Sequence, residues 1–220
     1  MSPWSRTSLA LIIVAQVSTI SAVLVSPSRH FPCRRHVAIG GGAALLFGAG
    51  QVSARTPGST DVSEAVIQIK QGRDALRGLQ QDWRTYACID REGRACNIDV
   101  ARKILGGVAP QRGEAAIETA KATPLYRIDG AFKAIRRYAL DAGADEWGSR
   151  LDVEAFVDRS EDIVFALKKT DDSFYGVVFA SKGTVQLEGI YKEAKQSVDR
   201  CLSDMDAVLA MLKDAKAPGL

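Results

Sequence analysis

The sequence predicts an all-α protein, an antiparallel four-helix bundle with short extra helices between the first two long helices. Over four long stretches, apolar residues recur at steps of three and four, the spacing of one buried face on an α-helix. The stretches are separated by shorter segments with Gly, Pro and capping residues. After residue 54, sustained strand-like alternation is absent except for the short YGVVFAS at 175–181. We therefore expect helices packed on helices.

The first long helix is expected to begin after Asp61 and to run to about Ala87. Asp61 and Glu64 have the spacing of a capping box, in which the N-cap side chain and a Glu three residues later satisfy free N–H groups. The apolar stripe that follows consists of Val62, Val66, Ile69, Leu76, Leu79, Trp83 and Tyr86.

Short helical pieces are expected next. After the loop CIDREGRACN, Asn97 is placed to cap the segment IDVARKIL, which ends before Gly106 and Gly107. The segment GEAAIETAKAT, residues 113–123, adds a further short helical piece.

Two more long helices are expected in the middle of the chain. The first starts at Pro124 and ends at Gly143, with the stripe Leu125, Ile128, Phe132, Ile135 and Ala139. Ser149 and Asp152 start the second, whose stripe is Val153, Phe156, Ser160, Ile163 and Leu167. The polar segment KKTDDS, residues 168–173, is expected to bend it, before the apolar pattern continues through Phe174, Val177 and Val178.

The last helix has the most regular pattern. Its apolar residues continue at three- and four-residue steps over almost four heptads: Leu187, Ile190, Ala194, Val198, Cys201, Met205, Val208 and Leu212. Such spacing is typical of the seam of a left-handed bundle. Because Cys201 lies on this seam, we expect it to be a buried and unreactive thiol.

The first 54 residues form a segment of different composition, with four arginines, both histidines and no Lys, Asp or Glu. A basic start and an apolar core end at small residues near Ala22, and a Ser- and Arg-containing segment follows. Arg34 and Arg35 then precede a second apolar run that closes in QVSA at Ala54. This order is typical of a secretory signal, an organelle transit segment and a twin-arginine signal.

We therefore expect a tripartite targeting leader over residues 1–54, for a protein of the plastid thylakoid lumen, and one bundle domain over residues 55–220. A single signal peptide followed by an unstructured spacer is the alternative.

The composition of residues 55–220 excludes several chemistries. This part contains no histidine, which excludes His-dependent triads, Cys–His pairs, His metal sites and the Glu-x-x-His motif of di-iron bundles. It also lacks a phosphate-binding Gly-Lys-Ser/Thr loop. Its acidic residues slightly outnumber its basic ones, so nucleic-acid binding loses its main support. We expect no cofactor, no bound metal and no catalytic residue.

Two cysteines form the first candidate site. Cys88 and Cys96 flank the seven residues IDREGRA in the loop after the first helix. In an oxidising compartment they could form a structural disulfide. Two free thiols and a redox couple are the alternatives, although a redox couple favours the closer Cys-x-x-Cys spacing.

Small basic clusters form the second candidate site. Lys133 lies near Arg136 and Arg137, and Lys168 is next to Lys169. Such clusters could dock on acidic lumenal surfaces of a membrane complex by charge complementarity. A solvated helix face is the alternative.

A histidine-free bundle behind a twin-arginine leader resembles the PsbQ-like extrinsic proteins of photosystem II, of the type found in red-lineage algae with secondary plastids. The resemblance covers targeting over residues 1–54 and architecture over 55–220. Within the second part, the sequence LEGIYKEAKQSVDRCLSDMDAVLAML has an apolar spacing common to helical bundles in general. It implies a non-catalytic subunit, peripherally attached to the lumenal face of the thylakoid membrane. Such a subunit stabilises the oxygen-evolving centre and its retention of calcium and chloride.

Three other functions remain open at the level of sequence. A lumenal subunit of photosystem I or its antenna would carry the same leader. A small lumenal thiol-redox protein would use Cys88 and Cys96. A helical bundle could also hold a small ligand such as a pigment, although residues 55–220 offer no histidine as an axial ligand for chlorophyll.

Overall fold

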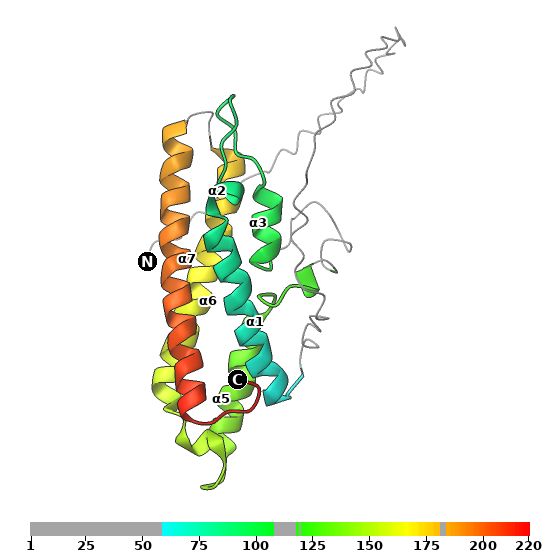
Figure 1. Ribbon diagram of the computed structural model, residues 1–220, viewed down its shortest axis with the longest axis vertical. Helices are drawn as coiled ribbons and strands as arrows, with labels where there is room; N and C mark the ends of the chain where they lie inside the picture. The colour runs from blue at the N-terminus through cyan, green and yellow to red at the C-terminus, as the bar shows by residue number, and fades with distance from the viewer. Residues whose placement is uncertain (1–58, 108–117, 119, 181–183) are drawn as a thin grey trace, which may run out of the picture. The chain divides into compact units, whose positions relative to one another are not determined.

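The computed structural model describes residues 59–107, 118, 120–180 and 184–220, all within the second of the chain's two units, Phe47–Leu220 (Figure 1). This described part is all-α, as the apolar spacing predicts. It contains no strand, and its one isolated antiparallel bridge joins Ile89 to Ala95. Among the described helices, none has both the length and the apolar character needed to cross a membrane.

Four long helices make up most of the described chain: α1 (Val62–Gln81), α5 (Ile128–Asp141), α6 (Val153–Gly176) and α7 (Thr184–Asp214). Helix α7 packs along α6 and against α1, while α5 packs against both α1 and α6 (Figure 1). The shorter elements are α2 (Trp83–Tyr86), α3 (Ile98–Ile104) and the 3-10 helices η1 (Trp147–Arg150) and η2 (Val177–Phe179). Helix α3 contacts α1 and α6.

The core is built from the apolar stripes that the sequence shows. On α5 and the turn before it, every residue of the expected stripe is buried. On α7 the whole stripe is buried except Ile190, which is half-buried. The largest fully buried side chains include Phe156 and Phe174 of α6. Since the hydrophobic contribution scales with the apolar area removed from water, these stripes hold the four helices together.

The start of α1 differs in one respect from the expected capping box. The Asp61 carboxylate accepts hydrogen bonds from the backbone N–H groups of Ser63 (2.8 Å) and Glu64 (3.2 Å), as a capping residue does. The Glu64 carboxylate does not return to the Asp61 N–H, so this half of the prediction is wrong. The Ser59 hydroxyl stands between them, accepting from the Asp61 N–H (3.1 Å) and donating to the Glu64 carboxylate (3.0 Å).

The end of the first helix is also earlier than expected. Helix α1 ends at Gln81 rather than near Ala87, because Asp82 leaves helical geometry. The carbonyl of Asp82 accepts from the Thr85 N–H at 2.8 Å, a three-residue step that starts the separate turn α2. The apolar spacing continues across this break, so the sequence pattern does not show where α1 ends.

The short helix α3 begins after Asn97, as expected, but Asn97 does not cap it. Its backbone is left-handed (φ 55°), and its side-chain amide donates to the Thr85 carbonyl at 2.8 Å. Asn97 thus ties α3 to the end of α2. At the other end, Gly106 has φ 78°, and a Cβ there would lie 2.8 Å from the Tyr126 backbone nitrogen. A glycine is required at that position for both reasons. The helical piece expected at 113–123 lies mostly outside the described residues.

Helix α6 is longer and more continuous than expected. Asp152 caps it by accepting from the Ala155 N–H at 3.1 Å. The segment 168–173, expected to bend it, lies within the continuous helix. The reason is that Thr170 faces the core, where its hydroxyl donates to the Ala166 carbonyl at 2.8 Å and needs no break in the backbone. Val178 was expected to continue the apolar face, but it is exposed on η2.

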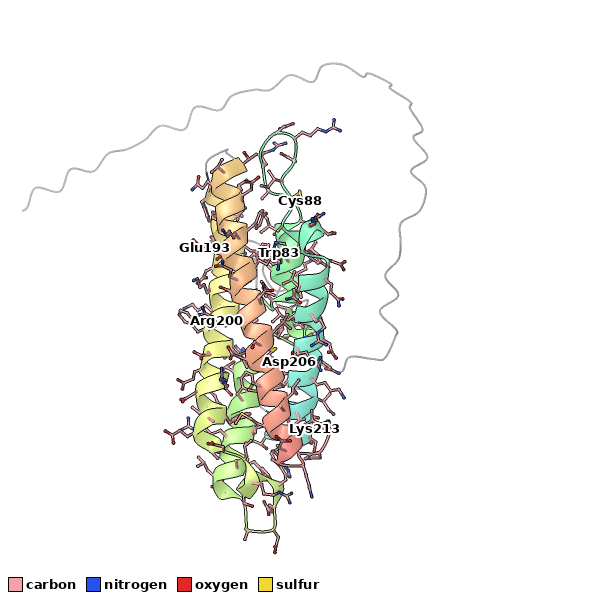
Figure 2. The ribbon with its side chains drawn as sticks, turned by 60° about the vertical axis from the view of Figure 1, so that its left-hand side comes forward. Trp83, Cys88, Glu193, Arg200, Asp206 and Lys213 are labelled. Carbon is pink, nitrogen blue, oxygen red and sulfur yellow. A yellow bond between two sulfur atoms is a disulfide. The ribbon has the colours of Figure 1, made fainter. Side chains whose placement is uncertain are left out.

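Charged residues reinforce the packing of α1 against α7. Asp206 of α7 lies 3.2 Å from the guanidinium of Arg77 and 3.6 Å from that of Arg73, both on α1 (Figure 2). These groups are partly exposed, so each pair contributes little to the free energy of unfolding.

Candidate functional site

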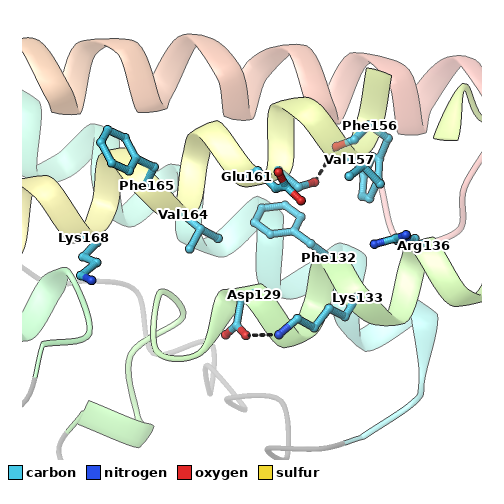
Figure 3. A pocket seen from close by; sticks show the side chains of 11 residues that line it. Asp129, Phe132, Lys133, Arg136, Phe156, Val157, Glu161, Val164, Phe165 and Lys168 are labelled. Carbon is cyan, nitrogen blue, oxygen red and sulfur yellow. Dashed lines mark hydrogen bonds and ion pairs between the residues drawn. The ribbon is translucent and has the colours of Figure 1, made fainter. Parts of the chain in front are cut away.

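A groove of about 460 Å³ runs between α5 and α6 (Figure 3). Its floor is apolar, with Phe132 from α5 and Phe156, Val157 and Val164 from α6. Phe132 and Phe156 are buried and pack edge to face, with ring centroids 6.1 Å apart. Phe165 lies at the edge of the groove and is 67% exposed, which is unusual for an aromatic side chain on a packed helix.

Three of the five basic residues singled out by the sequence line this groove: Lys133 and Arg136 from α5, and Lys168 from α6. The packing of α5 against α6 therefore brings the two clusters together. The other two do not line it. Arg137 lies at a neighbouring hollow beside α5, which shares Lys133 and Arg136 with the groove. Lys169 lies at a hollow between α6 and α7, which shares Phe165 and Lys168 with the groove.

The charges in the groove are not equivalent. The Lys133 ammonium donates to the Asp129 carboxylate at 2.9 Å, one turn earlier on α5, so it already has an ion-pair partner within its own helix. Arg136 and Lys168 have no ion pair with any described residue. Figure 3 shows these two cations at opposite ends of the groove, with Glu161 between them.

This arrangement suits binding of a ligand with an apolar face and anionic ends. The apolar floor contributes by being removed from water, and the two unpaired cations contribute orientation and charge complementarity. Within the described residues, no group of three or more His, Cys, Asp or Glu side chains is placed to hold a metal ion.

The loop cysteines occupy a different place. Cys88 and Cys96 are joined by a disulfide, with their Cα atoms 5.4 Å apart, in a turn near the end of α2 (Figure 2). Inside the turn, the Asp90 carboxylate accepts from the backbone N–H groups of Arg94 (2.8 Å) and Glu92 (2.9 Å). The hydrogen bond from the Arg94 backbone is the main cause that lowers the pKa of Asp90. The turn is thus closed by the disulfide and by hydrogen bonds to the Asp90 carboxylate.

Cys201 is fully buried in the core, as its place on the α7 stripe predicts. Its thiol lies 3.8 Å from the Ile163 carbonyl, to which it donates. Burial, assisted by the charge of Asp204, raises the pKa of Cys201 to about 12. The thiol is therefore protonated near neutral pH and inaccessible to reagents in the folded protein.

The targeting residues Arg34, Arg35 and Ala54 lie outside the described residues, as does Cys33. No protein family, curated protein or solved structure matches the chain. The groove and the sequence patterns are therefore the observations that bear on function.

Three of the apolar residues that line the groove were not anticipated from the sequence. Val157, Val164 and Phe165 line the groove but fall outside the apolar stripe expected for this helix. Val164 and Phe165 lie seven and eight residues after Val157, which places the three along a second, narrower apolar line on the same helix. An aromatic residue on such a line, a few residues before Lys168, is the signal that could have indicated an exposed binding surface.

Proposed function

We propose that the protein is a non-catalytic extrinsic subunit on the lumenal face of photosystem II, similar in kind to the PsbQ-like proteins of red-lineage algae. In this role it stabilises the oxygen-evolving centre and its retention of calcium and chloride. The observation that carries the proposal is the order of targeting segments that ends at Ala54, because a twin-arginine signal behind a transit segment addresses a protein to the thylakoid lumen. The mature chain then begins at Arg55.

We also propose that α1, α5, α6 and α7 form an antiparallel four-helix bundle. Each of these helices packs against two of the others, which is the pattern of neighbours in such a bundle. The connections between α5 and α6 (142–152) and between α6 and α7 (177–183) are shorter than the helices that they join, which favours chain reversal at each end. A bundle presents long helical faces, which suit docking on a larger assembly.

Docking is assigned to the α5–α6 groove. Arg136 and Lys168 are exposed and lack an ion pair within the described part of the chain, so they are available to acidic groups of a partner. Rim charges of this kind mainly set the orientation and rate of association. Attachment through them is peripheral and sensitive to salt.

The proposal is tested by washing thylakoid membranes with salt. Raising the salt from 0.1 M to 1 M shortens the Debye length from about 10 Å to about 3 Å, so charge-mediated contacts weaken and the protein is released. Oxygen evolution by the washed membranes should fall most at low calcium and chloride. Adding the purified protein back should restore it, whereas an equal amount of an unrelated helical protein should not.

One outcome would contradict the proposal directly. If the protein co-purified with photosystem I alone, and its removal left oxygen evolution unchanged, it would be a lumenal subunit of photosystem I or its antenna.

A further inference from the structure

The α5–α6 groove has a defined length and charge pattern. Val157 and Lys168, which both line it, are eleven residues apart on α6, and at a rise of 1.5 Å per residue this corresponds to about 16 Å, or about three helical turns. Arg136 lies at the Val157 end, and Lys168 itself forms the other end (Figure 3). Between the two cations the lining is apolar apart from Glu161, the Lys133–Asp129 pair and Ser160, whose hydroxyl donates to the Phe156 carbonyl.

We propose that this groove binds an amphipathic α-helix of a partner protein, about three turns long, with an acidic residue at each end of its apolar face. This inference deepens the proposed function and rests on it for the location of the partner, a lumenal segment of the photosystem. The recognition mode is a helix laid in an apolar groove, with anchoring side chains at positions i, i+3 or i+4, and i+7.

Phe165 is expected to be the main apolar contact. It is 67% exposed in the free protein and lies at the rim, where it borders both the groove and the hollow between α6 and α7. A partner helix seated on the floor would cover its ring. Because aromatic side chains dominate the energetics of interfaces, this contact should account for much of the affinity.

The charge pattern favours an acidic helix over an anionic lipid. A lipid carries its anionic group at one end of its acyl chain, so it would satisfy one of the two separated cations and leave the other unpaired. An acidic helix satisfies both Arg136 and Lys168. Glu161, which lies between them, disfavours an acidic residue in the central turn of the partner by like-charge repulsion.

The test measures binding of a synthetic peptide to the full chain by fluorescence anisotropy. The probe is a labelled, helix-forming peptide of about 14 residues, with Leu at i, i+3, i+4 and i+7 and Glu in its first and last turns. A twin peptide with Lys in place of each Glu controls for apolar binding. The Glu peptide should bind, and the Lys peptide should bind at least several-fold more weakly.

Variants of the chain locate the binding site. The double variant Arg136→Glu with Lys168→Glu should weaken binding of the Glu peptide about 3- to 30-fold, the effect expected for two exposed ion pairs. Its matched control is Arg137→Glu with Lys169→Glu, which changes the same charges on the same helices outside the groove and should change binding less than about twofold.

A second pair of variants tests the apolar contact. Phe165→Ala should weaken binding about 5- to 30-fold, because the peptide covers the exposed two-thirds of the ring. Its matched control is Phe179→Ala, since Phe179 is similarly exposed at 70% but lies on η2 and does not line the groove. These side chains are exposed, so thermal melts of the variants should superimpose on that of the parent chain.

Three results of the peptide and vesicle assays would overturn the proposal. They are equal binding of the two peptides, equal effects of the groove variants and their matched controls, and groove-dependent binding of phosphatidylglycerol vesicles without binding of the peptide. The last would identify the occupant as an anionic lipid.

Rebinding to salt-washed membranes separates this inference from the proposed function. If the groove variants still rebind and restore oxygen evolution, the helix site is wrong but the function stands. If the peptide binds as expected but the parent chain neither rebinds to the washed membranes nor restores oxygen evolution, the function is wrong.

Discussion

Replacing Arg102 with methionine should loosen the attachment of α3 to the long helices. The Arg102 guanidinium donates two hydrogen bonds to the Asp171 carboxylate of α6, at 2.8 and 3.2 Å. It also lies 4.8 Å from the centre of the Tyr175 ring. The two charged side chains are 10% and 23% exposed, so water screens the pair only partly. Methionine keeps the apolar stem and removes the charge.

The expected cost follows from these contacts. Removing one partner of a fully buried ion pair costs about 3–5 kcal/mol, because the other charge is left unpaired. Water reaches part of Asp171, which reduces this to about 2–3 kcal/mol, and loss of the contact with the Tyr175 ring adds about 0.5 kcal/mol. The sum is about 3 kcal/mol. For a domain of this size, that corresponds to a fall in Tm of about 6–12 °C.

The assay is urea unfolding followed by circular dichroism, with hydrogen exchange of the α3 amides as a local readout. Lys103→Met is the matched control, since Lys103 is an exposed cation on the same helix, and it should change stability by less than about 0.5 kcal/mol. Asp171→Ala combined with Arg102→Met should cost at least about 1 kcal/mol less than the sum of the two single variants, because no unpaired charge remains. Equal stability of the Arg102 and Lys103 variants, or simple additivity in the double variant, would refute the reasoning.

Three further predictions concern the cysteines and the leader. Reducing the Cys88–Cys96 disulfide opens a loop of about nine residues and should lower the free energy of unfolding by about 2–3 kcal/mol; superimposed urea curves with and without dithiothreitol would contradict this. Because burial raises the pKa of Cys201 from 9.0 to about 12, the unfolded chain loses a proton that the folded chain keeps, so stability is lost as the pH rises from 9 to 12. Cys201→Ala should reduce that slope by about one proton in urea midpoints measured across this range, and an unchanged slope would count against the assignment. Changing both Arg34 and Arg35 to lysine should block import into isolated thylakoids, and undiminished import would exclude the twin-arginine route.

The helices and most of the core could be predicted from the sequence because both depend on local spacing. The eight apolar residues of the α7 stripe recur along one face of a single helix. Their burial requires only that another part of the chain cover that face. The capping aspartates Asp61 and Asp152 are similarly local, since each bonds N–H groups two or three residues away.

Two expectations are wrong because the packing of the whole fold determines a residue's role. Asn is a residue type that commonly caps helices, but the side-chain amide of Asn97 donates to the Thr85 carbonyl instead. The segment 168–173 has the composition of a bend, yet Asp171 is held by Arg102 and Thr170 faces the core. Polar composition shows that a residue needs a hydrogen-bond partner, and it leaves open whether that partner is nearby in the chain or across the fold.

The groove is a property of the tertiary structure alone. The sequence marks Arg136 and Lys168 as members of two separate basic clusters and shows apolar lines on both helices, but it does not show which of these residues meet. Only the packing of α5 against α6 brings these cations to the two ends of one apolar floor and leaves Phe165 exposed beside it. The buried stripe determines which face of a helix points into the core. The angle and rotation at which two helices pack determine which residues beside the stripes lie next to each other.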